Sequence, residues 1–442
     1  MYRYLITLTS GITLMCSAYA ISADDLLGIY QLAEKNDPQF GAAQASHLAA
    51  LEAKPQSRAL LLPAISLSAS TTRDREDIKS SSSAFFTPET FYSTTTGYSV
   101  TLNQPVFNAG YFIQLRQADA QTGQAGAEYA AAQQDLIIRV AERYFDVLAA
   151  VDNMEFARAE KSAVDRQLEQ TKQRFEVGLI AITDVHEAQA AYDLVTAQEI
   201  EAENQLSSSQ EALRELTGQQ PAALANLTDK MQLIPPAPSD IDTWSDTALK
   251  QNFALIASEF LVKVAQNEIR VQRSGHLPTV DVTASYGLSA LDGGSFGARE
   301  TEDSAIGLRL SVPLYSGGAV TSGVREAMHL YDQARDNMEK QRRATLRQTR
   351  DAYLSATAAI NRVKALNQAV ISAQSALDAT AAGLEVGTRT TVDVLDARRE
   401  VFRAQQNHAR SRYDYILNTL RLKQAAGILG VADLEQINSW MQ

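Results

Sequence analysis

Apolar and polar residues alternate in four short segments of the chain, and this alternation predicts four β-strands. A period of two gives each strand one apolar and one polar face. We expect two β-hairpins, at about 64–104 and 279–312, with Pro105 and Pro313 ending the second strand of each. The alternating apolar positions are Ile65, Leu67, Ala69, Tyr98, Val100, Leu102, Val280, Val282, Ala284, Tyr286, Ile306, Leu308 and Leu310.

Two long stretches, 106–220 and 314–442, contain no proline, and they are expected to be helical because proline disrupts helix interiors. We predict continuous helices over 111–175 and 319–386, which at 1.5 Å per residue would be about 98 and 102 Å long. Such lengths exceed a compact domain of this mass. No run of 18 apolar residues occurs, which argues against a helical membrane protein.

Each long helix is followed by a glycine, Gly178 or Gly387, and then by a returning helix that begins near Asp184 or Asp393. The first returning helix carries a seam of small apolar residues spaced three and four apart, which is typical of a coiled coil. A shorter helical stretch precedes each hairpin, at about 39–62 and 247–277, and ends at a Leu-Pro pair.

The two halves of the chain resemble each other at an offset near 209 residues, so the sequence indicates an internal duplication. Val177-Gly178-Leu179 matches Val386-Gly387-Thr388, and Tyr144 matches Tyr353. The predicted division is a signal peptide at 1–20, a first repeat at 24–218, a linker at 219–246 containing Pro235, Pro236 and Pro238, a second repeat at 247–427 and a tail at 428–442.

The first residues have the pattern of a secretory signal. Arg3 precedes an apolar stretch from Leu5 to Met15, and Ala18-Tyr19-Ala20 is a cleavage site of small residues, with a second choice after residue 23.

The net charge of −12 disfavours a nucleic-acid partner. The single cysteine, Cys16, excludes a disulfide scaffold and a cysteine zinc cluster.

Strands with one apolar and one polar face need two environments. In an exported protein the apolar faces could contact lipid while the polar faces line water. A sheet in lipid must close, and four strands are too few for that, so several chains would share one barrel. Three chains give twelve strands. The alternative is a secreted coiled-coil structural or adhesive protein whose hairpins form a soluble sandwich.

Two segments carry a more specific resemblance. Residues 177–185 read Val-Gly-Leu-Ile-Ala-Ile-Thr-Asp-Val, and residues 386–397 read Val-Gly-Thr-Arg-Thr-Thr-Val-Asp-Val-Leu-Asp-Ala. With hairpins and long helices at matching places, the chain resembles the TolC family of outer-membrane channel-tunnel proteins over about 24–430. The resemblance implies a membrane α+β fold, in which a homotrimer forms a 12-stranded outer-membrane β-barrel continuous with a long periplasmic α-helical barrel. It also implies type I secretion or drug efflux, with a periplasmic adaptor and an inner-membrane transporter as partners.

The resemblance places a pore constriction at Asp393 and Asp396. These residues are three apart near a helix start, so they share one face, and three chains would bring six carboxylates into one ring. Cation preference and block by multivalent cations would follow. The structural alternative is that acids in a first helical turn only complement the helix dipole. The first repeat has Asp184 and Glu187 at the matching positions.

In the family, an arginine matching Arg389 belongs to a latch that closes the inner helices, with partners matching Thr183 and Asp184. The best-known member has a tyrosine where this chain has Leu384, and leucine cannot supply that hydroxyl. The adaptor-contacting tip is expected at the turns that contain Gly178, Leu179, Gly387 and Thr388.

Enzyme signatures are incomplete. Gly318 and Gly323 have the spacing of a phosphate-binding loop, but Val324-Arg325 follows where Lys and Ser or Thr are needed. The pattern Gly-x-Ser-x-Gly occurs once, at 293–297, but it lies in the polar loop of a predicted hairpin and not between a strand and a helix, as a nucleophile elbow requires. We therefore expect a passive duct in the cell outer membrane that extends into the periplasm, with no catalytic residues, cofactor or bound metal.

Overall fold

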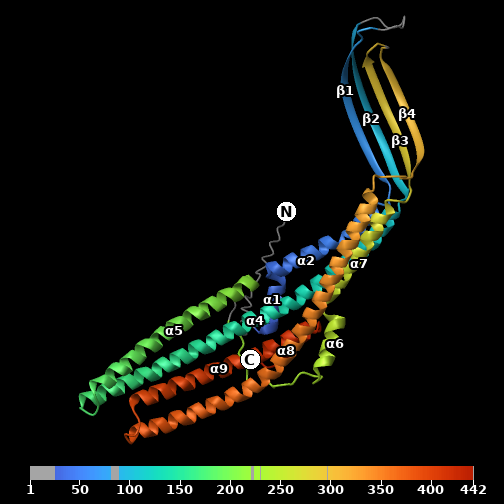
Figure 1. Cartoon of the computed structure of the whole chain (residues 1–442). Coiled ribbons are helices and arrows are strands. Elements are labelled where there is room, and N and C mark those ends of the chain that lie inside the picture. The colour runs from blue at the N-terminus through green and yellow to red at the C-terminus, as the bar shows by residue number, and fades with distance from the viewer. Residues whose placement is uncertain (1–24, 81–88, 221–222, 229, 296, 442) are drawn as a thin grey trace, which may run out of the picture.

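The computed structural model describes residues 25–80, 89–220, 223–228, 230–295 and 297–441. The predicted signal peptide lies outside these residues. The molecule is elongated, with a β-sheet at one end and the turns of four long helices at the other (Figure 1). The elements are α1 (Leu26–Asn36), α2 (Pro38–Leu51), α3 (Ala53–Ala59), β1 (Ala64–Asp77), β2 (Thr90–Phe107), α4 (Ala109–Glu176), α5 (Ile182–Thr217), α6 (Ile241–Gln251), α7 (Phe253–Ser274), β3 (Thr279–Gly293), β4 (Arg299–Ser311), α8 (Ala319–Glu385), α9 (Thr391–Ala425) and α10 (Val431–Asn438).

The four predicted strands are confirmed, and they form one antiparallel sheet in the order β1-β2-β3-β4. The register places the alternating apolar residues on one face, for example Leu67 opposite Val100 and Val100 opposite Tyr286. In the single chain this face is open to solvent, and the side chains of Leu67 and Ile306 are 73% and 83% exposed. One open sheet without a second sheet packed on it does not form the sandwich of the alternative interpretation.

The prediction that Pro105 ends its strand is wrong. β2 continues to Phe107, with an irregularity in its pairing with β3 between Pro105 and Phe107. Proline is tolerated there because the neighbouring strand β1 reaches only to the pair Ala64–Asn103. Beyond that pair, β2 has a partner on one side only, and a residue without an N–H can occupy the open side.

The two helical stretches predicted before the hairpins are each divided in the structure. In the first, the helix is interrupted at Glu52, and Pro55 explains the break because its ring disfavours a helical carbonyl four residues earlier. In the second, Asn252 has an extended backbone and its side chain accepts a hydrogen bond from the Leu255 amide. Asn252 therefore caps a new helix, α7.

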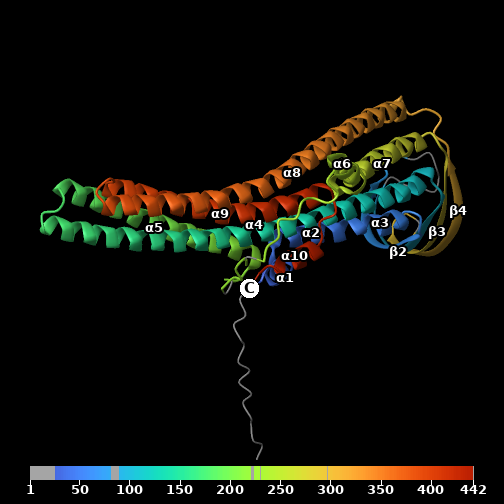
Figure 2. The same ribbon diagram turned by 90° about the horizontal axis from the view of Figure 1, so that it is seen from below.

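The two long helices are confirmed: α4 has 68 residues and α8 has 67. Each is about 100 Å long at the usual rise per residue. Each pairs with a returning helix, α5 or α9, and α9 also lies beside α4 (Figures 1 and 2). Within the described residues, no helix combines the length and the apolar character that crossing a membrane requires.

The main hydrophobic core lies midway along the long helices, where α1 packs against α4 and α10 packs against α1 (Figure 2). Tyr144 and Phe145 of α4, Ile416 of α9 and Leu434 of α10 are almost completely buried there. The Tyr144 hydroxyl donates to the Ala225 carbonyl at 2.8 Å, so the connection between the two halves is also fixed to this core. The helix turns beyond the core have much less tertiary support.

Candidate functional site at the helix turns

The two turns that join the long helices to the returning helices have the same backbone geometry. Gly178 and Gly387 have φ angles of 77° and 75°, in the left-handed region that favours glycine. The Gly178 amide bonds the Phe175 carbonyl at 2.8 Å, and the Leu179 amide bonds the Arg174 carbonyl at 2.9 Å. The second turn repeats both bonds, from Gly387 to Leu384 and from Thr388 to Gly383. This pair of bonds is the Schellman motif.

The side chains that follow the two turns differ. In α9, Thr390 is the N-cap, and its hydroxyl accepts a hydrogen bond from the Asp393 amide at 3.2 Å. The Asp393 carboxylate in turn accepts from the Thr390 amide at 2.8 Å, which completes a capping box. In α5 the N-cap is Ala181, which has no side-chain hydrogen bond to offer. Asp184 in the first turn of α5 therefore has no capping side chain to bond with, unlike Asp393.

Hydrogen bonds from the amide and hydroxyl of Thr390, with a smaller contribution from the nearby Arg389 guanidinium, lower the pKa of Asp393. Asp393 thus stays ionised to a lower pH than an ordinary aspartate. Asp396 lies three residues further along α9 and is 63% exposed, with its carboxylate 3.2 Å from the Arg399 guanidinium. An exposed pair of this kind contributes little to stability, so the charge of Asp396 remains available to ions in solution.

Arg389 folds back over the end of α8. Its side chain lies so close to Gly383 that a Cβ atom there would be 2.7 Å from the Arg389 Cγ. Within the described chain, no hydrogen bond or ion pair joins Arg389 to Thr183 or Asp184. Both views show the α4–α5 turn projecting beyond the α8–α9 turn (Figures 1 and 2). One chain therefore does not bring the predicted latch residues together.

Large apolar side chains are exposed at both turns. Leu179 is 70% exposed and Val386 is 75% exposed, and Val177 and Ile182 are also exposed. Exposed apolar groups on protruding turns are typical of a surface that another protein covers.

Above its first turn, α9 rests against α4 and α5. Leu395 belongs to a small apolar cluster with Val164 of α4 and Val195 of α5. The Arg398 guanidinium donates to the Ala163 carbonyl at 3.0 Å. Nearby, burial raises the pKa of Glu160, an effect that the charge of Arg399 partly offsets. These few contacts leave the start of α9 less firmly held than its far end.

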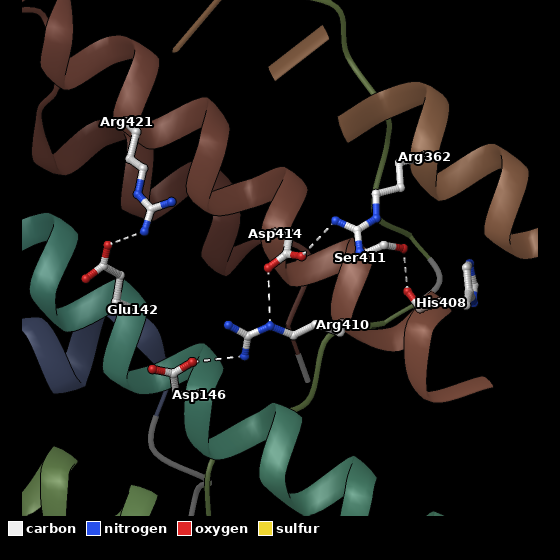
Figure 3. A network of polar contacts seen from close by, with 8 residues as sticks. All are labelled: Glu142, Asp146, Arg362, His408, Arg410, Ser411, Asp414 and Arg421. Carbon is white, nitrogen blue, oxygen red and sulfur yellow. Dashed lines mark hydrogen bonds and ion pairs between the residues drawn. The ribbon is translucent and has the colours of Figure 1, made fainter. Parts of the chain in front are cut away.

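The far end of α9 is held by a network of charged side chains, drawn in Figure 3. Arg410 bridges Asp146 of α4, at 2.9 Å, and Asp414 of its own helix, at 3.2 Å. Arg421 bonds Glu142 of α4 at 2.7 Å, and Arg362 of α8 lies 3.8 Å from Asp414. The network thus ties α9 to both α4 and α8, beginning about 21 Å along the helix from Asp396.

Thr390 and Arg399 are site residues that the sequence interpretation missed. Both leave a readable signal. Thr-x-x-Asp before a helix is the pattern of a capping box, and an arginine three residues after Asp396 predicts an ion pair on one helix face. In the part of the chain that the structure describes, no group of three or more His, Cys, Asp or Glu side chains could hold a metal ion.

Comparison with known proteins shows that the chain is similar to outer-membrane channels. It is 42% identical to the outer membrane protein TolC of Vibrio cholerae over 96% of this chain and 95% of that protein. It is 32% identical to the alkaline protease secretion protein AprF of Pseudomonas aeruginosa over 98% of this chain and 91% of that protein. The crystal structure of VceC from Vibrio cholerae matches the fold with a TM-score of 0.76 and 21% identity, covering 91% of this chain and 96% of that one.

The outer membrane efflux protein family matches residues 29–219 and 244–428, one segment in each half of the chain. The chain belongs to this family, the TolC family. It is an outer-membrane channel for efflux or secretion in a Gram-negative bacterium and not an enzyme. The family forms trimeric channels that work with efflux pump partners. The predicted fold class and the internal duplication are thereby confirmed, and the secreted coiled-coil alternative is wrong.

Proposed function

We propose that the α8–α9 turn forms the gated acidic entrance of the channel, through which substrates pass from a periplasmic adaptor and an inner-membrane transporter to the exterior. The observation that carries this proposal is the pair of arginines that flank the two acids of this turn, because the first repeat has acids at the matching positions, Asp184 and Glu187, but no such arginines. Arg389, Asp393, Asp396 and Arg399 lie within eleven residues, whereas the positions that match Arg389 and Arg399 in the first repeat hold Ile180 and Ala190.

Field focusing supports the role of the two aspartates. Asp393 is held in its ionised form by its capping bonds, and Asp396 is exposed. Three copies of the chain would place six carboxylates around one axis. A narrow ring of like charges raises the local concentration of counter-ions, so it favours cations and binds multivalent cations most strongly.

For the gate, we propose that Arg389 pairs with Thr183 and Asp184 of a neighbouring copy. Within one chain these residues make no bond with one another, whereas exposed Thr183 and partly exposed Asp184 could meet another subunit. Exposed pairs contribute only about 0.2–1 kcal/mol each, which suits a gate that must be released. Because Leu384 has no hydroxyl, the latch rests on the arginine alone.

For the adaptor, we propose contact at the turns that contain Gly178, Leu179, Gly387 and Thr388. The exposed Leu179 side chain supports this proposal, as does Val386 beside Gly387. The left-handed glycines fix the direction of both turns, so a partner would meet two preformed surfaces.

The test of the acidic entrance is block by a trivalent cation. We would reconstitute the purified trimer in planar bilayers and add La³⁺ on the side of the helix turns. The Asp393→Asn/Asp396→Asn variant should need at least about tenfold more La³⁺ for half block, because six charges leave the ring. Asparagine keeps an oxygen that can accept from Thr390, so the helix cap survives.

The matched control is Glu201→Gln/Glu203→Gln, which removes the same charge from exposed positions further along α5, outside the proposed latch. Its half block should stay within about twofold of the parent protein, because acids outside the narrowest ring contribute little to the focused field. An equal rise in the La³⁺ concentration for half block in both variants, or no rise in either, would contradict the proposed entrance.

A further inference from the structure

The sheet of the single chain has two open edges, one along β1 and one along β4. An unpaired edge exposes a row of N–H and C=O groups that need a partner strand. Because three sheets close into one barrel in this family, the partner of β4 is β1 of the next copy. The contacts within one chain do not fix which residues of β4 and of the neighbouring β1 lie opposite each other.

The charges of the two edges differ at the end of the sheet away from the helices. On the apolar face, the Arg73 guanidinium of β1 lies 5.8 Å from the centre of the Tyr92 ring. On the same face of β4, Glu302 accepts a hydrogen bond from the Tyr286 hydroxyl at 2.7 Å. Arg75 and Glu300 lie two residues nearer the outer end of their strands than Arg73 and Glu302, and therefore share this face. On this face the edge along β1 carries two arginines followed by Asp77, and the edge along β4 carries two glutamates.

Barrel geometry limits the possible registers. For twelve strands tilted by about 35–45°, the strand spacing and rise give a total stagger of about 12–18 residues. Threefold symmetry divides this into about four to six residues per copy, and the number must be even for side chains to keep their face. Only staggers of four or six residues therefore remain.

The strand pairing within one chain shows which residues each stagger would bring together between two copies. One row of the sheet runs from Ala69 through Tyr98 and Leu288 to Glu302. A stagger of four residues continues this row to Arg73 of the next copy, and one of six continues it to Arg75. In the opposite direction, a stagger of four would place Glu302 beside Ile65 in the apolar band, which is unfavourable because a carboxylate would face lipid.

A stagger of four residues brings opposite charges together on both faces. Besides joining Arg73 to Glu302, it places Arg75 opposite Glu300 and, on the polar face, Glu76 opposite Arg299. It also matches apolar residues with apolar residues, for example Leu67 with Leu308. Opposite charges and apolar pairs across strands stabilise a register, whereas like charges destabilise it.

A stagger of six residues keeps one opposite-charge pair, Arg75 with Glu302, but adds two like-charge pairs. It places Asp77 opposite Glu300 on the apolar face and Asp74 opposite Asp303 on the polar face. Both are like-charge pairs directly across two strands, which are destabilising.

We propose that β4 of each copy pairs with β1 of the next in the register that places Glu302 opposite Arg73, so that ion pairs at the outer end of the barrel select this closure. The proposal concerns the sheet and is independent of the entrance at the helix turns. Conductance block tests the entrance, and cross-linking tests the sheet.

The test is disulfide cross-linking in cell envelopes, in a Cys16→Ser background that removes the single cysteine. Directly opposed residues have Cβ atoms about 4.5–5.5 Å apart. Arg73→Cys/Glu302→Cys should therefore give covalent dimers and trimers on oxidation, and Arg75→Cys/Glu302→Cys should give at least about fivefold less. The control is Leu288→Cys/Glu302→Cys, a pair opposed within one chain. Oxidation of this control consumes both thiols without forming covalent oligomers.

Predominant oligomers from Arg75→Cys/Glu302→Cys would overturn the register. So would the absence of oligomers from both test pairs while the control oxidises. A second measurement covers variants that assemble poorly. Arg73→Glu should lower the temperature at which the trimer dissociates in detergent, and adding Glu302→Arg should restore at least half of the loss. A double variant that is no better than Arg73→Glu would contradict the pairing.

Discussion

The α4–α5 and α8–α9 turns share a backbone but differ in the chemistry of their side chains. Both end their long helix with a left-handed glycine and the same two hydrogen bonds. Only the second turn continues into a capping box, in which Asp393 bonds Thr390, and only the second carries Arg389 beside the acids. The corresponding N-cap of the first turn is Ala181.

This difference shows which parts of a duplicated unit are interchangeable. The glycine is required wherever a helix must reverse direction, because the left-handed conformation is strained for residues with a Cβ atom. The residues after it carry no such requirement and can diverge. A functional assignment must therefore come from the side chains, since the shared backbone does not distinguish the two turns.

The largest expected effect is a loss of stability of the same size at both turns. Gly178→Ala and Gly387→Ala should each destabilise their own turn by about 1–2 kcal/mol, because the left-handed conformation is unfavourable for alanine. A Cβ atom at either position would meet nothing within 4 Å, so no clash adds to the loss. Hydrogen exchange of the turn amides should accelerate by about 5- to 30-fold in each variant.

Gly41→Ala is the matched control for these two variants. Gly41 lies within α2, and a Cβ atom there would also meet nothing within 4 Å. Alanine should be neutral or stabilising at this position because it favours the helix. If exchange accelerated at only one of the two turns, the shared backbone would not be the cause.

The next effect should be confined to the second turn. Thr390→Ala removes the N-cap of α9 and should destabilise its first turn by about 1 kcal/mol. Exchange of the amides at 391–394 should become about fivefold faster. The change should also raise the pKa of Asp393, since the Thr390 hydroxyl is one of the groups that lower it.

The smallest effect is the reciprocal substitution in the first turn. Ala181→Thr would create the pattern Thr-x-x-Asp with Asp184, so the start of α5 should gain a few tenths of a kcal/mol or more. Exchange at 182–185 should slow by about twofold. Faster exchange in this variant would show that the two turns differ in backbone as well as in side chains.

The sequence predicted the strands and the long helices because both have strong periodic patterns. Alternation such as Ile65-Ser66-Leu67 has one structural meaning when it recurs in hairpins, and two proline-free stretches leave little choice but helix. The interruption at Glu52 and the continuation of β2 past Pro105 were not predicted. Each depends on which neighbouring strand or carbonyl the proline meets, and a linear pattern does not contain that information.

The candidate site was predicted less completely. The sequence allows Asp393 to be either a structural or an ion-binding acid, and in the single chain its carboxylate accepts the capping hydrogen bond from the Thr390 amide. The capping residue Thr390 could have been read from its spacing to Asp393. The latch could not be derived from one chain, since its proposed partners Thr183 and Asp184 lie on a different helix turn, and only assembly would bring them to Arg389.

The central claim, that the α8–α9 turn of one copy latches onto the α4–α5 turn of the next, is tested most directly by a double-mutant cycle on leak conductance. Arg389→Ser and Asp184→Asn should each raise the open probability of the reconstituted trimer by about 3- to 160-fold, from three exposed pairs of about 0.2–1 kcal/mol each. The double variant should leak no more than the leakier single variant, because both substitutions remove the same interaction. Independent, multiplying effects, or no effect of Asp184→Asn, would contradict the account.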